Sequence, residues 1–118
     1  MLKFELSKRL TRASEYQVIF RNPDIRIRSN KILLLAKANL HRYPRLGLVV
    51  GKKHLKKAIQ RNRCKRAIRE SFRLNQKNLP NYDMIVIALA GINSVTQKEL
   101  TENLGYAWLR LNKLAKKS

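Results

Sequence analysis

The chain has 118 residues, of which 44% are hydrophobic, and its 27 Lys and Arg residues against 7 Asp and Glu residues give a formal net charge of +20. This length predicts a single domain over residues 1–118, and the hydrophobic fraction excludes a wholly disordered chain. The charge implies a polyanionic partner, either nucleic acid or an anionic membrane surface, while no apolar run approaches the roughly 20 residues of a membrane-spanning helix.

The N-terminal sequence and the cysteine content narrow the compartment and the chemistry. Residues 1–10, MLKFELSKRL, have no apolar stretch of signal-peptide length and include an acid, so we expect a cytoplasmic protein. The single cysteine, Cys64, cannot form an internal disulfide, and no paired Cys or Cys/His spacing predicts zinc binding.

The first predicted element is a short helix. SEYQ, residues 14–17, matches a capping box, in which the first and fourth side chains cap the helix N-terminus. Tyr16, Ile19 and Phe20 then fall on one face, and Asn22-Pro23 ends the helix. Periodicity alone favours core packing for Tyr16 and Phe20, and the alternative is a stacking platform for unpaired bases.

Three segments of strand length follow. Residues 25–28 alternate apolar and basic side chains, residues 31–38 form an apolar run, and residues 45–51 form another that Gly51 closes. Asn30 lies between the first two segments and fits a tight turn. The simplest arrangement of three successive strands is an antiparallel meander.

The second half of the chain alternates helix, strand and helix. Residues 58–73 predict a helix, and residues 83–90 form a continuous apolar run typical of a central strand buried on both faces. TQKE, residues 96–99, is a second capping box, and it precedes apolar residues at helical spacing: Leu100, Leu104, Ala107, Trp108, Leu111 and Leu114. The order αβββαβα predicts an α+β fold, a two-layer sandwich in which helices pack on a four-stranded, mainly antiparallel sheet.

Residues 58–73, AIQRNRCKRAIRESFR, separate into two faces when placed on a helix at about 100° per residue. The face centred on Cys64 is predicted to pack on the core and also contains Gln60, Ala67, Ile68, Ser71 and Phe72. The opposite face is a basic stripe of Asn62, Lys65, Arg66, Arg69 and Arg73, which Arg61 and Arg63 flank. Because Cys64 lies at the centre of the packing face, we expect a buried, inert thiol rather than a nucleophile paired with His41 or His54.

The basic stripe departs from an ordinary solvated helix face, which mixes charges of both signs. Like charges at i, i+4, such as Lys65 and Arg69, destabilise a helix, and Glu70 is the only acid of the segment. Lys52, Lys53, Lys56 and Lys57 also precede the helix at the positive end of its dipole, where acids are normally favoured. A phosphate backbone would relieve both conflicts, so we interpret the stripe as a nucleic-acid-binding surface. Arginine suits forked phosphate contacts, and Asn62 can bind a base edge or a sugar hydroxyl.

The segment RLGLVVGKKHLKKAIQRNRCKRAIRESFR, residues 45–73, resembles the signature region of the bacterial ribonuclease P protein subunit. The Arg-Asn-Arg motif of that family, followed by Lys-Arg and a further Arg, corresponds to Arg61, Asn62, Arg63, Lys65, Arg66 and Arg69. SEYQVIF, GLVVGKK and DMIVIA stand in the family's order and spacing, so the resemblance covers nearly the whole chain. The family fold carries a left-handed crossover from the third strand through the central helix to the fourth, which sequence patterns would not predict, since about 98% of crossovers are right-handed.

The resemblance implies a subunit of an endoribonuclease that removes the 5′ leader of precursor tRNA. In the bacterial enzyme the catalyst is an RNA with bound magnesium ions, so the protein would supply no catalytic residue and bind no cofactor by itself. Its expected partners are the ribonuclease P RNA and precursor tRNA, with no membrane partner, and it would act as a monomer within the ribonucleoprotein.

The resemblance also assigns site residues. Tyr16, Phe20 and Arg12 would line a cleft for the single-stranded leader, which shifts the interpretation of the two aromatics from core packing toward binding. Some members have an aromatic in the second strand facing this cleft, whereas residues 31–38 are aliphatic here. The residues expected to contact RNA are Lys52, Lys53, Lys56, Lys57, Arg61, Asn62, Arg63, Lys65, Arg66, Arg69 and Arg73.

Two rival functions remain open. One is a different small basic RNA-binding protein, such as a ribosomal protein or a single-strand binder, and the other is an autonomous ribonuclease. The acids are spread along the chain with no pair placed for two-metal phosphodiester chemistry, which disfavours the second rival.

Overall fold

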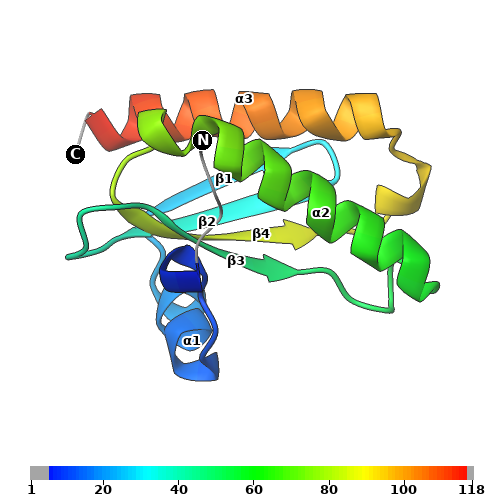
Figure 1. Cartoon of the computed structure of the whole chain (residues 1–118), viewed down its shortest axis with the longest axis horizontal. Coiled ribbons are helices and arrows are strands. Elements are labelled where there is room, and N and C mark those ends of the chain that lie inside the picture. The colour runs from blue at the N-terminus through cyan, green and yellow to red at the C-terminus, as the bar shows by residue number, and fades with distance from the viewer. Residues whose placement is uncertain (1–5, 117–118) are drawn as a thin grey trace.

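The computed structural model describes residues 6–116 and contains seven main elements in the predicted order αβββαβα (Figure 1). The helices are α1 (Ala13–Arg21), α2 (Ala58–Asn75) and α3 (Gln97–Lys116). The strands are β1 (Ile25–Ser29), β2 (Ile32–Ala38), β3 (Arg45–Val49) and β4 (Tyr82–Ala88). Single turns of 3-10 helix lie at Leu6–Lys8, Gln76–Asn78 and Ile92–Ser94. In the described range no helix is both long enough and apolar enough to cross a membrane.

The four strands form one sheet in the order β1-β2-β4-β3. β1 with β2 and β2 with β4 are antiparallel, whereas β3 with β4 is parallel, so the prediction of a mainly antiparallel sheet is confirmed. The predicted antiparallel meander is wrong, because β4 lies between β2 and β3. The reason is burial: Met84, Ile85 and Val86 of β4 are all buried on successive faces, which requires a central position.

The parallel pair β3 and β4 requires a crossover connection, and α2 supplies it. In Figure 1, α2 lies on the near side of the sheet, both strands point to the right, and β4 lies above β3. This arrangement is a left-handed crossover, as the family resemblance implied.

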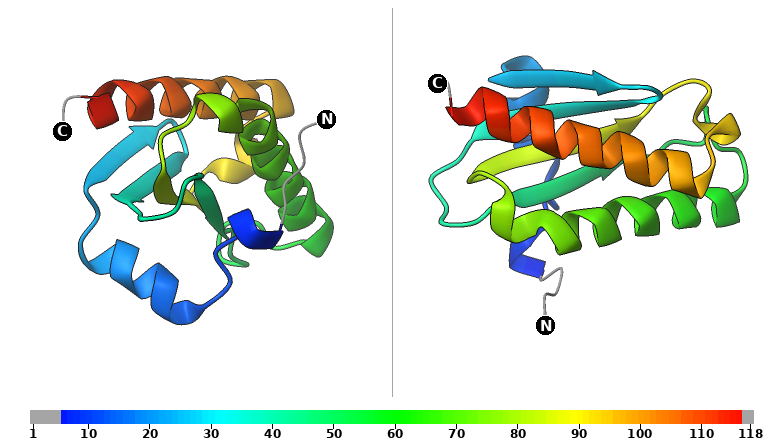
Figure 2. Two further views of the ribbon diagram at one scale, coloured as in Figure 1. Left: turned by 60° about the vertical axis from the view of Figure 1, so that its left-hand side comes forward. Right: turned by 90° about the horizontal axis from the view of Figure 1, so that it is seen from above.

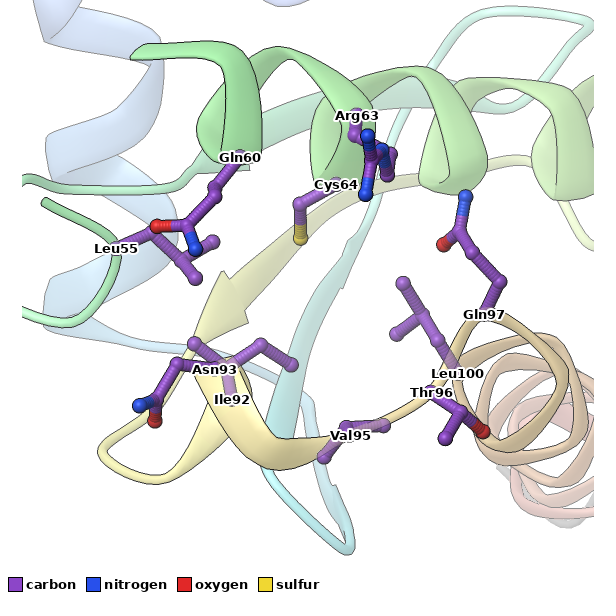
Figure 3. Close-up of a pocket in the computed structure, with 10 residues that line it drawn as sticks. All are labelled: Leu55, Gln60, Arg63, Cys64, Ile92, Asn93, Val95, Thr96, Gln97 and Leu100. Atoms are coloured by element: carbon purple, nitrogen blue, oxygen red, sulfur yellow. The ribbon is translucent and has the colours of Figure 1, made fainter. Parts of the chain in front are cut away.

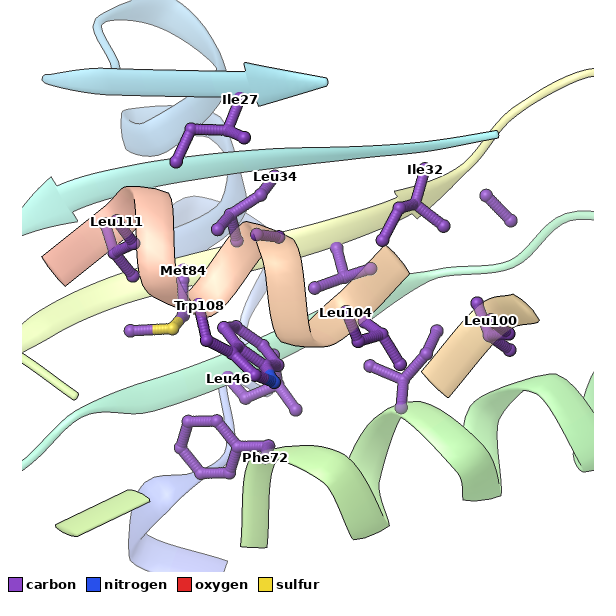
Figure 4. Close-up of a cluster of buried hydrophobic side chains, with 14 of the residues drawn as sticks. Ile27, Ile32, Leu34, Leu46, Phe72, Met84, Leu100, Leu104, Trp108 and Leu111 are labelled. Atoms are coloured by element: carbon purple, nitrogen blue, oxygen red, sulfur yellow. The ribbon is translucent and has the colours of Figure 1, made fainter. Parts of the chain in front are cut away.

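Helices α2 and α3 cover one face of the sheet and enclose the larger core (Figure 4). Phe72 of α2 and Trp108 of α3 meet edge to face with ring centroids 6.3 Å apart, and the indole Nε1 of Trp108 donates a hydrogen bond to Ser71 Oγ at 2.9 Å. Helix α1 packs on the opposite face of the sheet, where Ile19 contacts Leu35 and Ile85 (Figure 2).

The helix ends show which capping signals were correct. Thr96 and Glu99 form the predicted box at the start of α3: Thr96 Oγ1 accepts from the Glu99 N–H at 3.1 Å, and Glu99 Oε1 accepts from the Thr96 N–H at 3.0 Å. The box predicted at residues 14–17 is wrong, because α1 begins earlier and Ser14 lies inside it. Glu15 caps this end instead, since its Oε1 accepts from the backbone N–H of Thr11 and of Arg12.

The predicted packing face of α2 is largely confirmed. Cys64, Ile68, Ser71 and Phe72 are buried, and Ala67 is half-buried against the same core. Gln60 is exposed, contrary to the prediction, because the first turns of α2 project beyond the ends of β3 and β4 (Figures 1 and 2). The tight turn at Asn30 is present, and its backbone has a left-handed φ of 54°.

Candidate nucleic-acid interface

The basic stripe of α2 forms an open hollow of about 280 Å³ along the outside of the helix. Asn62, Arg66 and Arg69 line it and are exposed. Arg9 lines it as well, because the N-terminal segment pairs with β3 at Arg9 and Leu46. No local pattern in the sequence indicated a role for Arg9, since its position depends on a pairing between residues 37 positions apart.

The acid of α2 pairs within this surface. Arg73 Nε donates to Glu70 Oε2 at 3.0 Å, one helical turn apart. The hydrogen bond from Arg73 lowers the pKa of Glu70 and raises that of Arg73. Arg73 is therefore a partly neutralised cation, and we expect it to attract phosphate less than Arg66 or Arg69.

The lysine-rich loop before α2 lies in solvent, where Lys52, Lys53, Lys56 and Lys57 are all exposed. The N-terminus of α2 has no side-chain cap, and Lys57 occupies the N-cap position. Arg61 holds the end of this loop, because its Nη1 donates to the carbonyl oxygens of Leu55 and Lys56 at 2.9 and 2.8 Å. Arg61 thus has a structural role beside the predicted RNA contact.

Tyr16 of α1 joins the N-terminal segment to β3 and lines a hollow together with residues of α2. Its hydroxyl accepts from the Leu48 N–H at 3.1 Å and donates to the Leu10 carbonyl at 3.3 Å. The ring lies against Gly47, where an added Cβ would come within 2.7 Å of it. A second hollow, of about 290 Å³, has Tyr16, Lys65 and Arg69 in its wall.

Phe20 and Arg12 do not line this second hollow. Phe20 lies one turn beyond Tyr16, with ring centroids 6.3 Å apart, and is 44% exposed. Arg12 is exposed just before α1. The sheet beside α1 is aliphatic, because Leu33, Ile87 and Val49 are half-buried neighbours on this face.

A partly buried ion-pair network that the sequence did not reveal fixes α1 to the sheet. Arg45 of β3 donates two hydrogen bonds to the Asp83 carboxylate, at 2.8 and 2.7 Å, and one to Glu15 at 2.9 Å. Burial alone would raise the pKa of Asp83, but hydrogen bonds from Arg45 and Asn39 outweigh it and hold that pKa below its usual value. Burial also opposes ionisation of Glu15, whose pKa is lowered by hydrogen bonds from Arg12, Thr11 and Arg45. These interactions raise the pKa of Arg45, and the Asp83 carboxylate makes the largest contribution.

Cys64 lies beside a pocket of about 210 Å³ near the starts of α2 and α3 (Figure 3). The thiol is 5% exposed, and burial raises its pKa, which disfavours the nucleophilic thiolate. Among the described residues that line the pocket, none is a His, Asp or Glu that could act as a base. The described part of the chain also contains no group of three or more His, Cys, Asp and Glu side chains able to hold a metal ion. The geometry supports the interpretation of Cys64 as a packing residue.

Comparison with known proteins gives a consistent result. The model of the family Ribonuclease P matches residues 4–112. The ribonuclease P protein component of Pseudomonas aeruginosa is 45% identical over 108 residues, which are 92% of this chain and 80% of the relative. That of Azotobacter vinelandii is 43% identical over 92% of this chain and 83% of the relative.

Solved structures show the same likeness. The RNase P protein of Staphylococcus aureus has a TM-score of 0.80 at 28% identity, covering 91% of this chain and 96% of that chain. A second S. aureus structure, described as an RNase P protein mutant with defective mRNA degradation activity, has a TM-score of 0.78 at 28% identity and covers 93% and 89%. The RNase P protein of Thermotoga maritima has a TM-score of 0.77 at 30% identity and covers 86% and 96%. The chain therefore belongs to the bacterial ribonuclease P protein family, whose members are the protein components of a tRNA-processing enzyme.

Proposed function

We propose that the chain binds the ribonuclease P RNA and the 5′ leader of precursor tRNA, and thereby promotes removal of the leader. The observation that carries this proposal is the hollow where the Tyr16 ring meets Lys65 and Arg69. A ring for base stacking and cations for phosphates on one wall suit a single strand of RNA. Arg69 also lines the hollow on the basic face of α2, so the leader and the RNA subunit would lie side by side.

Within this proposal, the α2 face and its preceding loop contact the RNA subunit. The residues assigned to RNA binding are Lys52, Lys53, Lys56, Lys57, Arg61, Asn62, Arg63, Lys65, Arg66, Arg69 and Arg73, and those assigned to the leader are Tyr16, Phe20 and Arg12. Residues 1–118 would act as one RNA-binding domain and as a monomer in the cytoplasm.

We assign the chemical step to the RNA subunit with its magnesium ions, and no catalytic role to protein side chains. The interactions of the acidic side chains support this assignment, because most of them already have structural partners. Glu15 and Asp83 form ion pairs with Arg45, Glu70 forms one with Arg73, and Glu99 caps α3. The protein's contribution is then electrostatic, since a cationic surface reduces the repulsion between two RNAs.

Cleavage of precursor tRNA at low magnesium concentration tests the function. The ribonuclease P RNA is assayed with and without the chain, and we expect the chain to increase the cleavage rate. Absence of stimulation despite RNA binding would contradict the proposal and favour the alternative, a general small basic RNA-binding protein.

A third arm contains the chain alone, because a solved relative from S. aureus is described as an RNase P protein mutant with defective mRNA degradation activity. We expect no cleavage of precursor tRNA in this arm. Cleavage that His41→Ala or His54→Ala abolishes would instead identify an autonomous ribonuclease.

A further inference from the structure

A third hollow, also cationic, lies where α2 ends, on the loop 39–44 that connects β2 to β3. It has a volume of about 270 Å³, and Lys8, Arg42, Tyr43 and Lys77 line it. In Figure 1 this loop lies at the left, whereas α2 starts at the right. The hollow on the α2 face and this one share no lining residue, since Arg9 belongs to the former and Lys8 to the latter.

The cations of this hollow are unopposed within it. Lys8, Arg42 and Lys77 come from three separate segments of the chain, and none of the lining residues in the described range is an acid. Asp83, which lies near the base of the loop, is neutralised by Arg45. Three cations that line one hollow with no acid among its described residues favour a phosphate group as the occupant.

The loop also carries two neighbouring aromatic rings that are tilted against each other. His41 and Tyr43 lie with ring centroids 5.4 Å apart at an interplanar angle of 33°, and Lys8 Nζ lies 5.9 Å from the Tyr43 ring centroid. Tyr43 is half-buried, whereas His41 is exposed and can take a base. Rings beside unopposed cations suit an unpaired nucleotide rather than a duplex.

The backbone of the loop is held in place before any ligand binds. Asn39 Oδ1 accepts from the His41 N–H at 2.9 Å, and Asn39 Nδ2 donates to the Tyr43 carbonyl at 3.3 Å and to Asp83 Oδ1 at 2.9 Å. The network that fixes α1 to the sheet therefore also fixes this loop. A preorganised loop loses less conformational entropy on binding.

We infer that Lys8, Arg42, Lys77 and the His41–Tyr43 ring pair form an additional RNA contact, which binds an unpaired nucleotide of either the ribonuclease P RNA or the precursor tRNA. The inference rests on the proposed function and adds a contact outside the α2 face and the Tyr16 hollow. Arg66 and Lys77 are 11 positions apart, which is roughly 17 Å at the helical rise, so the two contacts protect different nucleotides.

The charge test compares two double variants. Arg42→Ala with Lys77→Ala removes two cations from the hollow, and Lys98→Ala with Lys113→Ala removes two exposed cations from α3. We expect the first pair to reduce the slope of log affinity against log salt by about 1.4 units for single-stranded contacts. It should also abolish protection of one RNA segment in hydroxyl-radical footprinting, and the control pair should change neither. Ribonuclease P RNA and precursor tRNA are probed separately to find which one contains the segment.

The ring test uses His41→Ala against His41→Phe, which retains a ring. We expect about a tenfold loss of affinity with alanine and recovery with phenylalanine. If the first double variant matches its α3 control in slope and footprint while Arg66→Ala weakens binding, this inference is wrong and the proposed function stands. If the wild-type chain neither binds nor stimulates the RNA, both are wrong.

Discussion

At the scale of single residues, Tyr16 both packs within the fold and lines the hollow that we propose binds the leader. Its hydroxyl joins the N-terminal segment to β3, and its ring lines a cationic hollow. Helical periodicity places such a residue on the inner face but cannot indicate that one side of its ring stays open. The residue that permits the contact, Gly47, is distant in sequence.

Gly47→Ala should disturb this contact, because the new Cβ would lie 2.7 Å from the Tyr16 ring. We expect a loss of about 1 to 3 kcal/mol in the free energy of unfolding from overpacking, and weaker affinity for precursor tRNA than for tRNA without a leader. Gly51→Ala is the matched control, since a Cβ there meets no atom within 4 Å. Urea unfolding and filter binding measure both effects. Equal behaviour of the two variants would show that the Tyr16 ring is not held by Gly47.

Asp83 and Glu15 predict how stability depends on pH. Both carboxyl groups have lowered pKa values in the folded state, so their contribution to stability is complete above the ordinary carboxyl pKa and is lost as the pH falls through the lowered values. We expect the free energy of unfolding to decrease in acid, and Asp83→Asn to flatten this decrease while costing about 1 to 3 kcal/mol at neutral pH. Asp24→Asn, at a more exposed ion pair, is the control. If the free energy of unfolding of Asp83→Asn decreased in acid as it does in the wild-type chain, Asp83 would not be a cause of the decrease.

At the scale of elements, local patterns were predictable and long-range pairings were not. The two faces of α2, the Thr96–Glu99 box and the double burial of β4 follow from the spacing of side chains within each element. The insertion of β4 between β2 and β3, the pairing of Arg9 with β3, and the Arg45 network depend on contacts between distant residues. The actual start of α1 was missed because the N-cap position is occupied by Arg12, which is not a residue type preferred there.

The like charges on α2 predict opposite effects on stability and binding. Arg69 lies one turn from both Lys65 and Arg73, so Arg69→Gln relieves repulsion within the helix. We expect the free energy of unfolding at low salt to stay equal or rise by about 0.2 to 0.5 kcal/mol, while the salt slope of RNA binding falls by about one unit. Arg110→Gln on the exposed side of α3 is the control and should leave the slope unchanged. A large loss of stability in Arg69→Gln would contradict this prediction and show that Arg69 stabilises the fold.

At the scale of the whole molecule, the charge is distributed unevenly between the two helices that cover the sheet. The exposed side of α3 includes Glu99 and Glu102 beside its lysines, whereas α2 presents mostly cations. Most acids of the described range pair with a cation or cap a helix. The basic surface is therefore left for an external anion, and α3 is expected to face away from RNA.

The net charge of +20 predicts that anions stabilise the fold. Ions that bind the folded form preferentially raise its stability by mass action, and self-repulsion is strongest at low ionic strength. We expect low millimolar pyrophosphate to raise the melting temperature above that in sodium chloride of equal ionic strength. Equal melting temperatures would mean that screening alone acts on the chain and that no anion site exists.

The central claim is that the hollow lined by Tyr16, Lys65 and Arg69 holds the leader of precursor tRNA beside the RNA subunit. The direct measurement is the affinity of the ribonuclease P RNA for precursor tRNA and for mature tRNA at low magnesium, each with and without the chain. We predict that the chain increases affinity for the precursor well beyond any increase for the mature tRNA, and that Tyr16→Leu removes most of this difference while Lys113→Ala does not. An equal effect of the chain on both tRNAs would contradict the claim.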